Sequence, residues 1–371
     1  MRILHVAPGI SRRLGGPTSL LRGLVPVQRE RGHTVTVVAT DLGAETDADR
    51  EVEGARVVAV PLVGPGRVGY GRGMRRVIRD EVQRADVVHI HGVYGLLLIV
   101  AMREARRAGV PYLVAPHGVW TPHHSPNNPA LNAAWDTLLL RPQMKGAHRV
   151  VADSERDAGF LREKGFERVT SMALGVDPAL QAIGTPWKDR TGVLFLSRVA
   201  RKKRVDLAIE AYARSGLAEQ GHDLVVAGPI EESLPYDPRE MVERLGIAGH
   251  VDFLGAVEER ERRDLLRRMR VFILASDDES FGIAVAEAAS AGMAVVASDR
   301  VVAMLEAEHD GVASTFPQDP DVLAEALTAA AGDDAEPAAV ALRDYARERW
   351  TWEHAAKQIE EMVAEPRTAS A

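Results

Sequence analysis

The chain has 371 residues, of which 46% are hydrophobic and 27% are charged, so its composition excludes disordered and collagen-like proteins. It contains no cysteine, which excludes a disulfide framework, a zinc-finger site, an iron–sulfur cluster and a cysteine nucleophile. The apolar run at the N-terminus is too short for a signal peptide, and no apolar stretch approaches the ~20 residues of a membrane span. We therefore expect a soluble cytoplasmic protein.

The net charge of −7 conceals two halves of opposite sign. Residues 1–185 carry 24 Lys and Arg against 18 Asp and Glu, whereas the remaining residues carry 22 against 35. A basic half suits an anionic acceptor or a membrane surface, although a surface charge without a partner gives the same balance.

The first half alternates apolar runs typical of buried strands with segments of helical periodicity. In chain order we expect strand 2–6, helix 16–31, strands 33–39 and 56–61, helix 73–84, strand 86–90, helix 96–108, strand 111–115, loop 116–128, helix 129–145, strand 148–152 and helix 154–164.

The second half repeats this alternation. We expect strands at 193–197, 223–227, 251–254, 271–274, 294–298 and 312–316, helices between them, and a final amphipathic helix at 352–364. Strands separated by helices predict parallel sheets, and two such halves predict an α/β protein of two doubly wound, Rossmann-like domains facing across a cleft. We place the domains at 1–183 and 193–349, with a linker at 184–192 that is rich in Gly, Pro and charge.

Two glutamates eight positions apart, Glu279 and Glu287, mark the loop and helix that follow the strand at 271–274. Free backbone N–H groups at the start of that helix, near Gly282, suit a diphosphate. Carboxylates so close to an anion suit neutral hydroxyls instead, such as those of a sugar or a ribose. In the alternative interpretation Glu279 only faces the helix dipole and Glu287 is solvated, but the small apolar neighbours of Glu287 favour a partnered carboxylate.

A basic segment follows the first strand of the second half, with five Lys and Arg in the seven positions from Arg198 to Arg204. Positive charge at a strand end suits a pyrophosphate leaving group, for which Arg198 and Lys203 are candidates. A solvated basic turn is the alternative, and the acidic second half disfavours a nucleic-acid partner.

Glycines and histidines follow strands in the first half. Gly15 and Gly16 do not form the dinucleotide fingerprint, but they allow a ligand to approach the backbone, unless they form an ordinary turn. His91 and His117 each precede a glycine at a strand end, and His117 suits a hydrogen bond to a substrate hydroxyl. His123 and His124 lie nearby, yet no spacing of ligands supports a metal site, so we predict none.

Together these residues resemble the family 4 retaining glycosyltransferases, which have the GT-B fold. The E-x7-E pattern of Glu279 and Glu287 carries most of the resemblance, and Arg198 and Lys203 match the donor-phosphate pair. Further matches are the glycine loop 15–16, HIHG at 89–92, PHG at 116–118, GVD at 175–177 and TWEHAAKQ at 351–358. Departures from the family pattern occur at Leu174, at Met293–Ala294 and at Val301–Val302.

The resemblance implies a role for each matching residue. Glu287 would hold the nucleotide ribose and Glu279 the hydroxyls of the donor sugar. Arg198 and Lys203 would stabilise the diphosphate, and His117 would face the reacting sugar. The remaining donor contacts would come from Gly15, Gly16, Phe281, Gly282 and Ile283, and the acceptor side would include His91, Arg12 and Arg13.

The resemblance further implies a metal-independent enzyme without a cofactor. It would transfer a hexosyl group from a UDP- or GDP-sugar to a glycan, lipid-linked or small-molecule acceptor with retained configuration. Domain 1–183 would lie on the acceptor side, domain 193–349 would bind the donor, and the C-terminal helix 350–366 would pack back on the first domain. The alternatives are another GT-B enzyme such as a sugar-nucleotide epimerase, a nicotinamide-dependent oxidoreductase, and a sugar-binding protein without activity.

An arginine-rich stretch bears on the acceptor. The spacing of Arg72, Arg75, Arg76 and Arg79 places four arginines on one helix face, and Arg67 and Arg84 flank them. This face fits an anionic or lipid-linked acceptor and a weak peripheral contact with the inner membrane face. A helix covered by surface salt bridges is the alternative.

Overall fold

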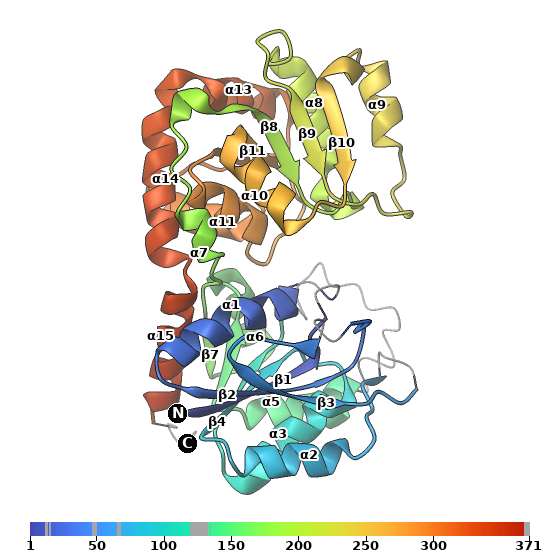
Figure 1. Ribbon diagram of the computed structural model, residues 1–371, viewed down its shortest axis with the longest axis vertical. Coiled ribbons are helices and arrows are strands. Elements are labelled where there is room, and N and C mark those ends of the chain that lie inside the picture. Colours follow the sequence, from blue (N-terminus) through green and yellow to red (C-terminus); the bar gives the residue numbers. More distant parts are fainter. Residues whose placement is uncertain are drawn as a thin grey trace. The chain divides into compact units, whose positions relative to one another are not determined.

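The computed structural model describes residues 1–11, 14, 16–46, 50–64, 68–118, 133 and 135–366. It divides the chain into two compact units, each built around one parallel sheet (Figure 1). Unit 1 comprises Met1–Gly175 and Trp352–Ala371, and unit 2 comprises Val176–Thr351. The expected architecture of two doubly wound, Rossmann-like sheets is confirmed.

The sheet of unit 1 has seven parallel strands in the order β3-β2-β1-β4-β5-β6-β7. These are β1 (Arg2–Gly9), β2 (Thr34–Thr40), β3 (Ala55–Val60), β4 (Val87–His91), β5 (Tyr112–Ala115), β6 (Arg149–Ala152) and β7 (Val169–Ser171). The apolar runs predicted the first six strands. The short edge strand β7 was not predicted, because a three-residue run carries too little periodicity.

Helices cover both faces of this sheet. They are α1 (Gly16–Glu30), α2 (Met74–Val82), α3 (Leu96–Ala108), α5 (Arg141–Lys145), α6 (Glu155–Glu163) and α15 (Trp352–Ala364), with a π-helical turn at Asp136–Leu140. α1 and α15 lie on one face, and α2 and α3 on the other (Figure 1). Trp352 of α15 packs so closely on Gly23 of α1 that a Cβ there would lie 2.1 Å from the indole.

The sheet of unit 2 has five parallel strands in the order β10-β9-β8-β11-β12. These are β8 (Thr191–Leu196), β9 (Leu224–Ala227), β10 (Val251–Gly255), β11 (Met269–Leu274) and β12 (Ala294–Ala297). Its helices are α7 (Pro178–Gln181), α8 (Val205–Ser215), α9 (Pro238–Arg244), α10 (Glu259–Arg268), α11 (Ile283–Ser290), α12 (Val302–His309), α13 (Pro320–Ala331) and α14 (Glu336–Arg349).

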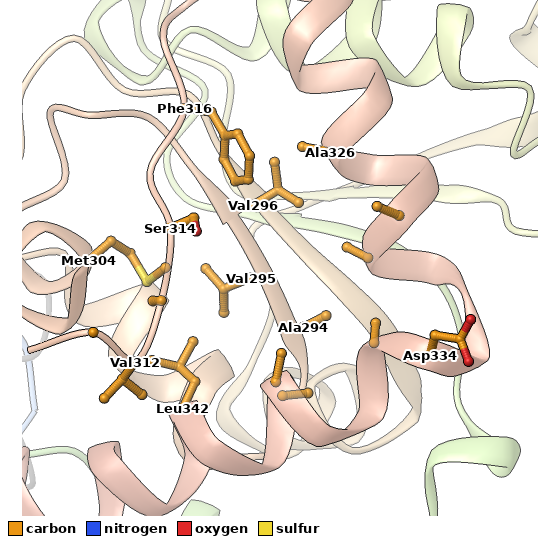
Figure 2. A pocket seen from close by; sticks show the side chains of 17 residues that line it. Ala294, Val295, Val296, Met304, Val312, Ser314, Phe316, Ala326, Asp334 and Leu342 are labelled. Atoms are coloured by element: carbon orange, nitrogen blue, oxygen red, sulfur yellow. The ribbon is translucent and has the colours of Figure 1, made fainter.

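The predicted sixth strand of this half, at 312–316, does not form. Its pairing with β12 within the described residues is a single bridge between Ser298 and Phe316. The N–H groups of Val312 and Ala313 instead donate to the carbonyl of Ala307 at the end of α12, which holds the chain away from β12. An apolar cavity of about 570 Å³ lies beside β12, between α13 and α14, and no predicted site residue lines it (Figure 2).

The segment expected as a linker, 184–192, packs within unit 2. Trp187 is buried, and the guanidinium of Arg190 donates to the carbonyls of Leu266 and Met269 at 3.0 and 2.9 Å. These contacts make the segment part of unit 2, which begins at Val176, whereas we expected the first domain to extend to residue 183. No helix among the described residues is long and apolar enough to cross a membrane.

Candidate functional site

Two loops of unit 2 meet at the carboxyl ends of the neighbouring strands β8 and β11. The N–H of Asp277, after β11, donates to the carbonyl of Lys202, after β8, at 2.8 Å. Arg204 adds an ion pair to Asp277 at 3.2 Å and a second to Asp206 at 2.9 Å. The topology therefore brings together the basic segment and the acidic loop that the sequence singled out separately.

Lys203 and Glu279 form an ion pair at this junction. Their side chains are 13% and 12% exposed, and the Ser276 hydroxyl donates to the same carboxylate oxygen at 2.9 Å. The pair satisfies both charges without a ligand. An anion that binds Lys203 must therefore compete with Glu279 for the ammonium group.

Arg198 lies further from the protein interior. Its side chain is 62% exposed and donates to Glu231, in the loop after β9, at 2.6 Å. Sequence reasoning did not identify Glu231, although its position after a strand end was a usable signal. In this conformation Arg198 pairs with that carboxylate.

The start of α11 carries no side-chain cap. Gly282 precedes the helix at a φ of 104°, and a Cβ there would lie 2.7 Å from Val301, so the position requires glycine. Phe281 is buried and packs edge-on against Trp350, with ring centroids 5.8 Å apart. The loop before α11 is therefore held by packing at Phe281 and Gly282. The backbone N–H groups of the first turn of α11, beginning with Ile283, suit an anion.

Glu287 lies in the second turn of α11 with a side chain only 13% exposed. Burial raises the pKa of this carboxyl group, and the ion pair that it forms with Arg262 of α10 counteracts the rise. Arg262 also donates to Glu259 at 2.8 and 3.1 Å, and these carboxylates keep the pKa of Arg262 raised although burial alone would lower it. The interpretation of Glu287 as a solvated residue is therefore wrong. The sequence predicted a partnered carboxylate, and in the structure its partner is Arg262.

The sequence analysis did not identify Arg262. The i, i+3 spacing of Glu259 and Arg262 signals an ion pair along α10, but it gives no indication of the contact with α11. A second arginine extends this set of ion pairs: Arg263 donates to Glu259 and to Asp177 at 2.8 Å each. Asp177 in turn caps the N-terminus of α7.

In unit 1, three neighbouring strands bring His91, His117 and Asp153 together at their carboxyl ends. His117 Nδ1 lies 3.0 Å from a carboxylate oxygen of Asp153, and His91 Nδ1 lies 3.4 Å from His117 Nε2. His117 has a φ of 54°, in the left-handed region that residues other than glycine rarely adopt. Both ring nitrogens of His117 are therefore engaged within unit 1. Asp153 directly follows β6, so the strand-end rule used for the histidines could have identified it.

The chain of imidazoles extends beneath α1. Alternation along β1 and β4 points Leu4 and Ile90 toward α2 and α3, and therefore points His5 and His91 toward α1. His5 Nδ1 lies 2.9 Å from His91 Nε2, and His5 Nε2 bonds to the side-chain oxygen of Gln28 of α1 at 2.8 Å. Burial lowers the pKa of His5 to about 4 and also lowers the pKa of His91, so both rings are neutral at pH 7.

His89 completes a buried group that could hold a metal ion. His5, His89 and His91 can each present a ring nitrogen within 4.8 Å of the others. However, the facing nitrogens of His5 and His91 already hydrogen-bond to each other, and a metal would have to replace that bond. Neither ring nitrogen of His89 has a hydrogen-bond partner among the described residues, and burial lowers its pKa.

Several predicted residues lie outside the described part of the chain, namely Arg12, Arg13, Gly15, Arg67, His123 and His124. Gly16 is the first residue of α1.

The arginine-rich face differs from the expectation, because α2 begins at Met74 and Arg72 precedes it. Its arginines have acidic partners: Arg75 pairs with Glu104 at 3.1 Å, and Arg76 with Asp80 at 3.8 Å. Arg75 and Arg76 remain 70% and 84% exposed.

Two family models match this chain, and several known proteins are similar to it. The family model described as "Glycosyl transferases group 1" matches residues 180–349, and that described as "Glycosyl transferase 4-like domain" matches residues 15–175. The phosphatidyl-myo-inositol mannosyltransferase of Mycolicibacterium smegmatis is 29% identical, over 97% of this chain and 92% of that protein. The GDP-mannose:cellobiosyl-diphosphopolyprenol alpha-mannosyltransferase of Xanthomonas oryzae is 25% identical, over 81% of this chain and 79% of its own.

Solved structures show the same fold. The crystal structure of Anabaena HepE in complex with UDP matches with a TM-score of 0.77 at 19% identity, and the match covers 98% of this chain and 100% of HepE. The structure of WaaG, a glycosyltransferase involved in lipopolysaccharide biosynthesis, matches with a TM-score of 0.65 at 15% identity, over 98% of this chain and 100% of WaaG.

Proposed function

Because the chain belongs to the family 4 glycosyltransferases, which have the GT-B fold, we propose that it transfers a hexosyl group from a UDP- or GDP-sugar with retention of anomeric configuration. The acceptor is a glycan, a lipid-linked molecule or a small molecule. The observation that carries the proposal is the convergence of Lys203, Glu279 and the uncapped start of α11, with Glu287 in the second turn of that helix.

Each residue of unit 2 has a part in the proposed donor site. The diphosphate accepts hydrogen bonds from the N–H groups at the start of α11 and from Lys203, which it takes from Glu279. Glu279, once released, accepts hydrogen bonds from hydroxyls of the donor sugar. Glu287 accepts them from the ribose, and Arg198 turns from Glu231 to the diphosphate.

The proposed transfer takes place on one face of the sugar. The bond between the anomeric carbon and the diphosphate oxygen breaks, and the acceptor oxygen forms its bond on the same side. The acceptor proton passes to the departing diphosphate oxygen. Lys203, Arg198 and the start of α11 stabilise the charge that develops there, so the step needs no divalent metal.

The names of the relatives support the choice of donor and acceptor. One relative is named for GDP-mannose and a diphosphopolyprenol-linked acceptor, another for phosphatidyl-myo-inositol, and HepE was crystallised with UDP. For this chain we propose an anionic or lipid-linked acceptor that contacts unit 1. Arg76 of α2 supports it, because its ion pair with Asp80 is exposed on both sides, contributes little and leaves the guanidinium group available.

A thermal-shift panel of nucleotide diphosphates and nucleotide sugars tests the proposal. A ligand at about 100 times its Kd stabilises by about 2.7 kcal/mol, so UDP or GDP and one of their sugars should raise Tm clearly. NADH and NADPH serve as the control, because a shift with them alone would favour an oxidoreductase. Conversion of a nucleotide sugar without any acceptor to an isomeric sugar would favour an epimerase instead.

A further inference from the structure

We propose that Arg262 is the positioning residue for Glu287: it fixes the carboxylate in place and keeps it ionised, so that Glu287 can accept hydrogen bonds from the nucleotide ribose. This inference deepens the proposed donor site and rests on the ribose role of Glu287. Arg262 lies on α10, outside the loops that follow the strand ends.

The side chain of Arg262 is held in place by Glu259 as well as by Glu287. Two hydrogen bonds from its Nε and Nη2 atoms, at 3.1 and 2.8 Å, clamp it to Glu259 within the same helix. Its remaining Nη1 atom reaches across to Glu287 Oε1 on α11. A planar guanidinium held at both ends fixes the direction of the Glu287 carboxylate, which a flexible ammonium group would not do as well. The contact with Arg262 engages Oε1 of Glu287, so the proposal assigns the other oxygen, Oε2, to the ribose hydroxyl.

The arrangement is also an alternating line of charges. Glu287, Arg262, Glu259, Arg263 and Asp177 follow one another with opposite signs, and the line joins α11, α10 and the N-terminus of α7. Glu259 and Asp177 face Glu287 as like charges and oppose its ionisation, whereas Arg262 favours it. Arg262 is thus the positively charged group that offsets both burial and these two carboxylates.

The chemistry of ribose recognition requires the ionised form. A carboxylate accepts hydrogen bonds on both oxygens, so one oxygen can remain with Arg262 while the other accepts from a hydroxyl. A protonated carboxyl group presents one hydroxyl that acts as a donor, and the charge-assisted bond is lost. Without Arg262, burial would raise the pKa of Glu287 further and shift the carboxyl group toward this protonated form.

The first experiment measures the affinity for UDP and GDP by calorimetry between pH 6 and pH 8. The wild type gives the reference profile, which includes the ionisation of the nucleotide's own terminal phosphate, with a pKa of about 6. In Arg262→Met, which keeps the length but removes the charge, affinity should fall beyond this reference by up to about tenfold for each pH unit below the raised pKa of Glu287. Arg262→Lys should restore most of the wild-type profile. Arg267→Met is the matched control, because Arg267 lies on the same helix, is 61% exposed and pairs with Asp264.

A second measurement needs no nucleotide. The pKa of Glu287 is already raised in the folded wild type, and Arg262→Met should raise it further above the unfolded value. The stability linked to the protonated carboxyl group is present at low pH and is lost as pH rises through the folded pKa, so the variant should lose more of it than the wild type. The Tm of this variant should therefore fall, relative to the wild type, between pH 5 and pH 8. The double variant Arg262→Met/Glu287→Gln should show no such fall.

The outcomes separate the two ideas. A Kd in Arg262→Met that equals that of the wild type at every pH would overturn the positioning role while leaving the donor site intact. A loss of affinity that is the same at every pH, with no difference in Tm between the single and double variants, would reduce Arg262 to a packing residue. If the wild type bound neither UDP nor GDP, the proposed function itself would fall, and the ribose role with it.

Discussion

Exchanging each glutamate of the E-x7-E pattern for glutamine should change nucleotide affinity in different ways. Glu287→Gln removes a charged acceptor from the ribose, and a hydrogen bond to a charged group contributes about 1.5–3 kcal/mol. Its affinity for UDP or GDP should therefore fall by about 10- to 150-fold. Arg262 keeps Glu259 as its partner in this variant, so the remaining charge is not left alone.

Glu279→Gln should leave the affinity for the bare nucleotide unchanged or increase it. The wild-type carboxylate pairs with Lys203, and a diphosphate must displace it. Removing its charge frees the ammonium group for the diphosphate, so UDP should bind at least as tightly as to the wild type. The loss should appear only with the nucleotide sugar, whose hydroxyls need Glu279.

Isothermal titration of both variants with UDP, GDP and one of their sugars measures these differences. Melting temperatures of the two variants serve as the folding control. If Glu279→Gln weakened the bare nucleotide as much as Glu287→Gln does, the division of roles between the two glutamates would be refuted.

Three further predictions concern metal, acid and membrane. The Kd of UDP or GDP should be the same with and without excess chelator, and loss of binding on chelation would contradict the metal-independent site. Burial lowers the pKa of His5 to about 4 and also lowers that of His89, so proton uptake favours the unfolded chain and Tm should fall as pH drops from 6.5 to 4. His89→Leu removes a ring that has no hydrogen-bond partners among the described residues, so Tm should depend less on pH in this variant. An unchanged dependence of Tm on pH would contradict the contribution of His89. The protein should co-sediment with anionic but not neutral vesicles at low salt and be released at high salt, since each basic residue near the surface contributes about 1 kcal/mol; no binding to anionic vesicles at low salt would remove the membrane contact.

The sheets could be predicted from sequence because each buried strand is a local signal. VTVV and VLFL are short β-branched or apolar runs between helical segments, and each forms an interior strand of its sheet. The run at 312–316, VASTF, also contains residue types that favour strands, namely Val, Thr and Phe, but did not become a strand. Its hydrogen bonds go to the end of α12, a choice that depends on tertiary packing and leaves no trace in a five-residue window.

The residues of the candidate site could be predicted singly but not as pairs. Glu279 and Lys203 were each placed at a strand end, yet their ion pair joins residues far apart in sequence and depends on the order of β8 and β11 in the sheet. The contact between Arg262 and Glu287 could not be predicted, because the charge-rich sequence of α10 is typical of an exposed helix. The role of Arg262 becomes visible only when α10 and α11 lie side by side with Glu287 buried between them.

The stereochemistry of transfer tests the central claim most directly. With the UDP- or GDP-hexose that gives the largest thermal shift, proton NMR can follow the sugar that the enzyme transfers to water or to an acceptor, before the free sugar mutarotates. The account predicts release of UDP or GDP and a first-formed product with the anomeric configuration of the donor. A product of inverted configuration, or no nucleotide release with any UDP- or GDP-hexose, would contradict it.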